Sequence, residues 1–164
     1  MESCKDHGGT VWCWGGSLDP RRELQEFEVS LSGNVAAVTV AVNCTEDGDY
    51  NPAAVIVIGP GPNGNQSGLT VTLDDPLPDP DCCTFTFAGD VVDTYPYETL
   101  AGDVNFSGRV NATDKNLVKG QMFVGGALNE NNFFYDVNAS GRINSTDKNI
   151  VKGFMGHEAV VPCG

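Results

Sequence analysis

Two stretches of the chain repeat each other almost letter for letter: DVNFSGRVNATDKNLVKGQM, residues 103–122, and DVNASGRINSTDKNIVKGFM, residues 136–155. The second stretch starts 33 residues after the first, and 15 of the 20 positions are identical. Such high identity within one chain indicates two copies of one small structural unit. The repeat therefore fixes how the C-terminal third of the chain is organised.

Each copy opens with D-x-N-x-S-G-x-x-N-x-x-D, a pattern that spaces oxygen donors along a twelve-residue loop. Side-chain oxygens fall at positions 1, 3, 5, 9 and 12, position 7 offers its backbone carbonyl, and glycine at position 6 permits a sharp turn. This is the ligand spacing of an EF-hand-type calcium loop. The predicted ligands are Asp103, Asn105, Ser107, the carbonyl of Arg109, Asn111 and Asp114 in the first loop, and Asp136, Asn138, Ser140, the carbonyl of Arg142, Asn144 and Asp147 in the second.

The predicted donors are all hard oxygens, which favours Ca²⁺ over zinc or copper. Magnesium fits less well, because a cage of many protein oxygens suits the larger and more adaptable ion. We therefore expect two bound Ca²⁺ ions. Two features depart from the EF-hand motif: Asp replaces Glu at position 12, and no helix is predicted before each loop. The shorter carboxylate leaves the calcium affinity open.

A helix is predicted after each loop, since Thr113 with Asp114, and Thr146 with Asp147, place hydroxyl and acidic groups at a helix start. Apolar residues within each predicted helix form a stripe, by which the two helices are expected to pack together. These residues are Leu117, Val118 and Met122 in the first helix, and Ile150, Val151, Phe154 and Met155 in the second.

Two loop–helix units with no preceding helix, 33 residues apart, closely resemble a type I dockerin module, the small calcium-binding domain that docks on cohesin. The resemblance covers residues 100–157 and includes the lead-in AGDVN at residues 101–105. It implies a protein partner and, because both copies keep nearly the same recognition pair, an approximately two-fold surface with two binding orientations. By position it implies a partner surface of Ala112, Thr113, Lys119, Ser145, Thr146 and Lys152. The alternative for the two lysines is that they only solubilise an exposed face.

The region before the repeat has the pattern of short β-strands. Apolar and polar residues alternate over residues 27–31, 38–42 and 69–73, and the connectors are rich in Gly, Pro and Asn. We predict an antiparallel β-sandwich of immunoglobulin type, in which residues 53–58 form a strand covered on both faces. The predicted domains are an N-terminal Cys/Trp segment at 1–17, the sandwich at 18–99, the dockerin-like domain at 100–157 and a tail at 158–164. This arrangement resembles extracellular proteins of environmental bacteria in which an immunoglobulin-like domain precedes a dockerin-type repeat.

The cysteine content points to an oxidising compartment. The six cysteines, Cys4, Cys13, Cys44, Cys82, Cys83 and Cys163, form an even set without a C-x-x-C motif, and two histidines add little support for zinc. Adjacent Cys82 and Cys83 cannot easily bond to each other. We expect Cys4 to pair with Cys13, Cys44 with one of the adjacent pair, and Cys163 with the other or with a neighbouring chain. The expected location is extracellular or at the cell surface, in a bacterium.

Nine Lys and Arg residues against 22 Asp and Glu residues give a net charge of −13. A surface this negative repels phosphate backbones and anionic lipid headgroups, so nucleic acid and membranes are poor partners, whereas cations are good ones. The longest uncharged apolar run is far short of the ~20 residues needed to cross a bilayer. Residues 1–15 contain no apolar signal region, so we expect that any secretion signal has been removed or was never in this numbering.

No catalytic motif stands out. His7 and His157 lie at opposite ends of the chain, and neither a G-x-S-x-G turn nor an H-E-x-x-H helix occurs. We therefore expect a non-enzymatic, extracellular assembly protein that docks on a β-domain. Because cohesins are β-sandwiches and this chain carries no other cargo, head-to-tail docking of identical copies into a filament is one form of this hypothesis. Attachment to a separate cohesin scaffold is the alternative.

A carbohydrate-binding module is a further alternative. Trp12 and Trp14 flank Cys13 and offer aromatic rings on which sugars could stack. The competing interpretation is that both rings cover one edge of the sandwich beside a disulfide.

Overall fold

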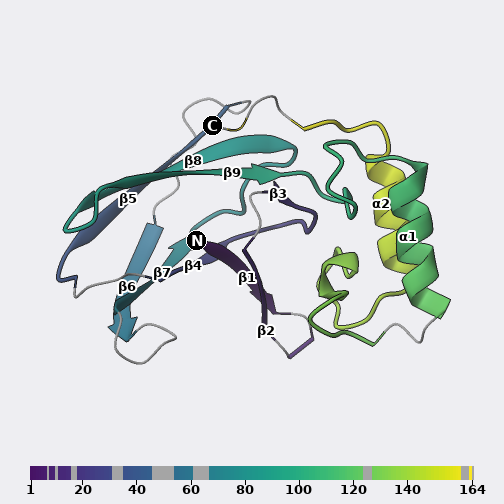
Figure 1. Ribbon diagram of the computed structural model, residues 1–164, viewed down its shortest axis with the longest axis horizontal. Coiled ribbons are helices and arrows are strands. Elements are labelled where there is room, and N and C mark those ends of the chain that lie inside the picture. The colour runs from purple at the N-terminus through teal and green to yellow at the C-terminus, as the bar shows by residue number, and fades with distance from the viewer. Residues whose placement is uncertain are drawn as a thin grey trace.

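The computed structural model describes residues 1–164 except 7, 10, 16–17, 31–34, 46–53, 61–66, 124–126, 160–162 and 164. Within that part, nine strands in two sheets precede a pair of α-helices that lies beyond one end of the sheets (Figure 1). The strands are β1 (Glu2–Asp6), β2 (Val11–Trp14), β3 (Leu18–Asp19), β4 (Glu26–Ser30), β5 (Val38–Cys44), β6 (Ala54–Pro60), β7 (Ser67–Leu73), β8 (Asp81–Gly89) and β9 (Asp93–Thr99). The helices are α1 (Ala112–Phe123), the short 3₁₀ helix η1 (Phe133–Tyr135) and α2 (Ser145–Phe154).

The five-stranded sheet has the order β2-β1-β4-β7-β6 and the four-stranded sheet the order β3-β9-β8-β5. All strand pairs are antiparallel except the two-residue β3, which runs parallel to β9. That pair departs from the purely antiparallel prediction. We refer to the strands together, residues 2–99, as the β-region; its immunoglobulin-like sandwich topology stays a prediction.

One apolar core joins the two sheets. Alternation along β4 and β8 turns Phe27 and Phe85 inward while Glu26, Glu28 and Thr86 stay exposed. The Phe27 ring lies 4.7 Å from that of Phe85 across the sheets, and the edge of the Tyr97 ring meets Phe27 at 5.3 Å. The period-2 patterns in β4 and β8 therefore bury one face of each of these strands.

Two expectations about the β-region are corrected by the structure. Residues 1–17 were predicted to precede the sandwich, but β1 and β2 extend the five-stranded sheet through pairing of β1 with β4. The strand predicted at residues 53–58 was expected to be covered on both faces. In the structure β6 is the edge of its sheet, because it pairs only with β7 among the described residues. Ile58 is exposed, and the side chains of residues 53–57 lie outside the described part.

Leu100 marks the change from one core to the other. A second apolar cluster contains Leu100, Val104, Val110, Val118, Val137, Ile143 and Val151, and so draws on both loops and both helices. Val118 and Val151 are the buried apolar residues of α1 and α2, whereas Leu117 and Met155, predicted to lie on the packed stripe, are exposed. The two helices pack against each other as the repeat predicts.

The second cluster and the β-region are joined without an extended linker. The amides of Leu100 and Gly102 donate to the carbonyls of Asp19 and Pro20 at 3.2 and 2.8 Å. The fully buried Arg21 pairs with Asp19 at 2.8 Å, and its guanidinium carbon lies 5.4 Å from the centre of the Phe133 ring. A buried ion pair of this kind fixes geometry because neither charge can move without losing its partner.

Disulfides connect distant parts of the chain. Cys44 bonds to Cys83 across β5 and β8, and Cys82 bonds to Cys163, 81 residues further on. This selects one of the two pairings that the sequence left open for the adjacent cysteines. Cys13 is also disulfide-bonded, and Cys4 stands opposite it in the β1–β2 register; the Cys4 side chain lies outside the described part of the structure.

Among the described residues, the structure contains no helix with the length and apolar character needed to cross a membrane.

Candidate metal loops and docking surface

The first loop is closed by its own oxygen-bearing side chains. The carboxylate of Asp103 accepts the amides of Ser107 and Gly108 at 3.0 and 2.6 Å. The Ser107 hydroxyl lies 3.3 Å from Asp103 Oδ1 and 3.1 Å from the carbonyl oxygen of Arg109. Three of the predicted donor oxygens thus converge on one point.

The second loop repeats this arrangement contact for contact. Asp136 accepts the amides of Ser140 and Gly141 at 3.0 and 2.8 Å, and the Ser140 hydroxyl lies 3.2 Å from both Asp136 Oδ1 and the carbonyl oxygen of Arg142. The two loops therefore share one geometry as well as one sequence.

Backbone conformation explains the loop shape. Gly108 and Gly141 at position 6 have φ of 77° and 88°, a region that glycine enters without strain. Phe106 and Ala139 at position 4 also have positive φ, 57° and 53°. Sequence reasoning missed this second turn, because nothing in a Phe or an Ala signals a left-handed residue. The same unusual conformation at the same position of both loops shows that the loop imposes it.

Asp114 and Asp147, at position 12, reach back across their loops from the first turn of α1 and α2. Asp114 accepts the amides of Asn105 and Asn111 at 3.2 and 2.8 Å. Asp147 accepts those of Asn138 and Asn144 at 3.4 and 2.9 Å. The shorter side chain is therefore accommodated because the backbone brings it to the centre of the loop.

The four loop carboxylates are fully buried: Asp103, Asp114, Asp136 and Asp147. Burial raises the pKa of Asp114 above its ordinary value, and the nearby charge of Asp103 raises it further against the backbone hydrogen bond from Asn111. Burial likewise raises the pKa of Asp147 to about 6, opposed by the hydrogen bond from Asn144 and assisted by Asp136. Each loop thus brings two buried carboxylates close together.

Both helices start where the sequence predicts, with Thr113 and Asp114, and Thr146 and Asp147, in their first turns. Asn144 caps α2: its side-chain oxygen accepts the Thr146 amide at 2.7 Å, and Asp147 completes the capping box. Asn111 accepts the Thr113 amide at 2.8 Å in the same way. The position 9 asparagines thus serve as caps, which suits a position that often reaches the ion through a water.

The oxygen donors in each loop fit a calcium ion. Ca²⁺ takes six to eight oxygens at 2.3–2.6 Å, which places neighbouring ligand oxygens about 3 Å apart. The Ser–Asp and Ser–carbonyl spacings in both loops have this size. Two buried carboxylates per loop would supply the negative charge that a divalent cation neutralises.

The predicted partner residues are all on the surface. The recognition pairs and both lysines are exposed: Ala112, Thr113, Lys119, Ser145, Thr146 and Lys152. Each pair lies in the first turn of its helix, and each lysine lies on the same helix further on. The structure thus places equivalent exposed residues on both halves of the repeat.

The second loop also contacts the β-region. Gly8, at the turn between β1 and β2, approaches so closely that a Cβ there would lie 2.9 Å from the Ser140 carbonyl oxygen. The Arg22 amide donates to the Val137 carbonyl at 3.4 Å. The first loop is held instead by the segment after α2, where Ala159 donates to Gly108. The two loops therefore have different neighbours despite their equal geometry.

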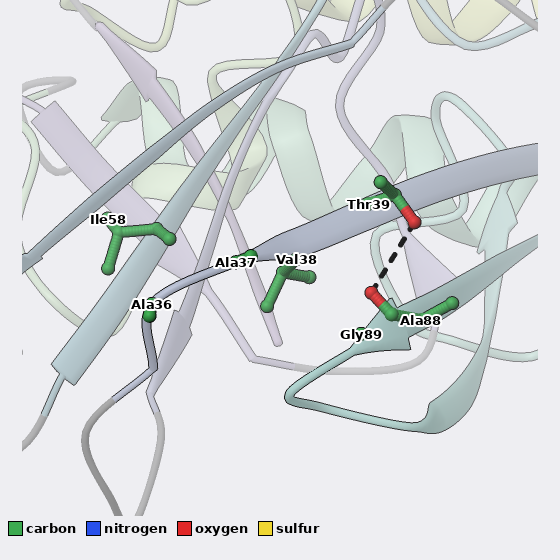
Figure 2. Close-up of a pocket in the computed structure, with 7 residues that line it drawn as sticks. All are labelled: Ala36, Ala37, Val38, Thr39, Ile58, Ala88 and Gly89. Carbon is green, nitrogen blue, oxygen red and sulfur yellow. Dashed lines mark hydrogen bonds between the residues drawn. The ribbon is translucent and has the colours of Figure 1, made fainter.

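Two other features give no support for a further site. Cys44, Asp81 and Cys83 place potential ligand atoms within 4.8 Å of one another, but the two cysteines are bonded together and offer no thiolate. Figure 2 shows a pocket of about 270 Å³ between β5, β6 and β8, where Ile58 faces Val38 and Thr39 donates to the Ala88 carbonyl. Its lining contains no acid or base. The side chains of Trp12 and Trp14 lie outside the described part of the structure.

The repeat is similar in sequence to a known protein family. Residues 101–155 match the model of the dockerin type I domain. The matched range starts two residues before Asp103 and ends just after α2, so it contains both loops and both helices. The match supports a type I dockerin module, a calcium-binding unit that docks on a protein partner, typically cohesin. We call these residues the dockerin-type region.

The match is confined to about a third of the chain, and the β-region is not part of it. Neither the curated proteins nor the solved structures that were compared contain a match to this chain.

Proposed function

We propose that this chain is a non-catalytic extracellular protein that binds two calcium ions and, through the dockerin-type region, docks on a β-domain of another chain. The observation that carries the proposal is the pair of closed loops, in which four buried carboxylates converge with hydroxyl and carbonyl oxygens. The disulfides agree with an oxidising location outside a bacterial cell.

In this proposal each loop holds one ion. Asp103, Asn105, Ser107, the Arg109 carbonyl and Asp114 supply direct ligands in the first loop, and Asn111 reaches the ion through a water. Asp136, Asn138, Ser140, the Arg142 carbonyl, Asp147 and Asn144 take the same roles in the second. Because a metal site formed only on folding contributes its binding free energy to folding, calcium would stabilise this region directly.

The partner surface is the exposed side of α1 and α2, with Ala112, Thr113, Lys119, Ser145, Thr146 and Lys152 as its predicted contact residues. Leu117, Phe123 and Met155 are also exposed on or next to these helices, and Phe123 is 79% exposed. Exposed large apolar side chains, aromatic ones above all, are typical of a surface that another protein covers.

The junction between the dockerin-type region and the β-region favours docking between identical copies of the chain. The hydrogen bonds of Leu100 and Gly102 join the dockerin-type region to the β-region at one end, and the Cys82–Cys163 disulfide returns the chain to β8 at the other. The helix pair is thus held in a fixed orientation to the sheets. A heterologous contact repeated between rigid, identical copies propagates as a filament unless it closes into a ring.

Mass measurement in solution tests the proposal. Purified protein in calcium should grow in mass with concentration, as followed by light scattering or sedimentation, and should return to monomers in EDTA. The matched control carries Asp103→Ala and Asp136→Ala and should stay monomeric in either buffer. A wild-type chain that stays monomeric at high concentration in calcium would contradict copy-to-copy docking.

The alternative partner is a separate cohesin, which the family match favours. Calcium-dependent capture of a purified cohesin by a monomeric chain would support this version. If the chain neither self-associates nor binds cohesin, the proposed docking function is wrong.

A further inference from the structure

The charge of the chain is divided unevenly between its two parts. Residues 1–99 contain three basic and 16 acidic residues, a net charge of −13. The dockerin-type region contains six basic and five acidic residues, a net charge of +1. The overall charge of −13 therefore comes from the β-region, and the repeat has the opposite sign.

The contrast at the surface is larger than these totals. Four of the five acidic residues in the dockerin-type region are the buried loop carboxylates, and Glu130 is the fifth and is exposed. The basic residues Arg109, Lys119, Arg142 and Lys152 are exposed. The outside of this region is therefore mainly positive, and a calcium ion in each loop would neutralise the two carboxylates buried there.

The exposed side of the helix pair combines charge with apolar surface. The exposed residues of this side include Lys119, Leu117 and Phe123 on α1, Lys152 on α2, and Met155 directly after α2, and the Lys119 ammonium is 6.0 Å from the centre of the Phe123 ring. We call this set the helix-pair surface. A surface of this composition favours an acidic partner with some uncharged area.

The β-region presents a matching surface on its five-stranded sheet. Glu26 and Glu28 project from the outer face of β4, the central strand, and their neighbours on β7 are Thr72 and Thr70. Among the described residues neither glutamate has a salt bridge. Two acids elsewhere in the β-region are engaged instead: Asp19 with Arg21, and Asp90 with the amides of Ala36 and Ala37. We call this face the β4–β7 surface.

We propose that the helix-pair surface of one copy docks on the β4–β7 surface of a second copy, with Lys119 and Lys152 facing Glu26 and Glu28. The inference rests on the proposed docking function and names its partner surface. Like charges keep the β-regions of two copies apart, whereas the helix pair is attracted to a β-region. The helix pair lies beyond one end of the sheets (Figure 1), so the contact is directed from the helix end of one molecule to a sheet of the next.

Reciprocal charge reversal tests this contact. One variant carries Lys119→Glu and Lys152→Glu, so that both of its surfaces are negative. The other carries Glu26→Lys and Glu28→Lys, so that both are positive. Each variant alone should need at least about tenfold more protein than wild type to assemble in calcium, because like charges meet at every contact. An equimolar mixture should assemble again, since each helix-pair surface then meets an opposite β4–β7 surface.

A matched control reverses two exposed acids outside β4 and β7, in the variant Glu23→Lys with Asp93→Lys. This variant should assemble like wild type, although its net charge changes by the same amount. If the Glu26 and Glu28 variant assembles in calcium as well as wild type does, the inferred contact is wrong. That result would not contradict the docking function. A mixture of the two reversed variants that stays dispersed would also show that the inferred contact is wrong. Wild type that fails to assemble at all would instead contradict self-docking.

Discussion

At the scale of single residues, Asp114 and Asp147 stand where two structural requirements meet. Each lies in the first turn of its helix and at the same time closes the loop before it by accepting two backbone amides. Both are fully buried beside a second carboxylate. The hydrogen bonds hold these two carboxylates in position, and their burial costs free energy. A cation bound in the loop would offset that cost.

The raised pKa of Asp147 predicts how the metal-free protein responds to pH. Its pKa is about 6 in the folded chain and 3.8 ordinarily, so between these values the folded state binds more protons than the unfolded state. The stability of the EDTA-treated protein should therefore fall as pH rises from about 4 to about 6. Calcium must displace the proton, so its affinity should rise over the same interval and level off near pH 7.

Thermal unfolding of the EDTA-treated chain across this pH range measures the effect. Asp147→Asn keeps an oxygen acceptor for the Asn144 amide but removes the titrating group, so its profile should be flatter than that of wild type. A wild-type profile that rises between pH 4 and 6 would show that Asp147 is not protonated in the folded chain.

At the scale of elements, the two loop–helix units were predictable and their surroundings were not. Short-range patterns in the repeat predict the loops, their position 6 glycines and the helix starts. The structure has each of them within a residue or two of the predicted place. The alternation in β4, β5, β7 and β8 was equally local. By contrast, the pairing of β1 with β4, the parallel β3 and the contact of Gly8 with Ser140 join distant residues. No local pattern specifies such contacts.

The contact at Gly8 gives an element-scale prediction. Gly8→Ala adds a Cβ only 2.9 Å from the Ser140 carbonyl oxygen, so either the β1–β2 turn or the second loop has to shift. We expect a lower unfolding temperature and weaker calcium binding at one of the two sites. Gly9→Ala is the matched control: Gly9 also has positive φ, 99°, but a Cβ there meets nothing within 4 Å.

Both variants carry the strain of a non-glycine residue at positive φ, so the difference between them isolates the contact. Calorimetric calcium titration of the two variants checks it. Equal calcium binding by Gly8→Ala and Gly9→Ala would show that the β-region does not support the second loop.

At the scale of the whole molecule, the Cys82–Cys163 disulfide encloses the dockerin-type region between two attachments to the β-region. It closes a loop across 81 residues of separation, and long closed loops restrict the unfolded chain most. The same bond prevents the end of the chain from leaving β8 when calcium is removed. The disulfide and the backbone hydrogen bonds of Leu100 and Gly102 thus connect the repeat to the β-region on both sides.

Replacing both cysteines tests this coupling. In the variant Cys82→Ser with Cys163→Ser, the free energy of unfolding should fall by about 3–5 kcal/mol. Limited proteolysis in EDTA should cut the dockerin-type region of the variant much faster than that of wild type, while calcium should protect both. Equal proteolysis of the two proteins in EDTA would contradict a role for the disulfide in holding the region.

Calcium binding by the two loops is the claim on which docking, pH response and stability all depend. Calorimetric titration of the EDTA-treated full-length chain measures it most directly. We predict that the wild-type chain binds two ions, that the Asp136→Ala variant binds one, and that the double variant Asp103→Ala with Asp136→Ala binds none. A folded wild-type chain that takes up no calcium in this titration would contradict the account.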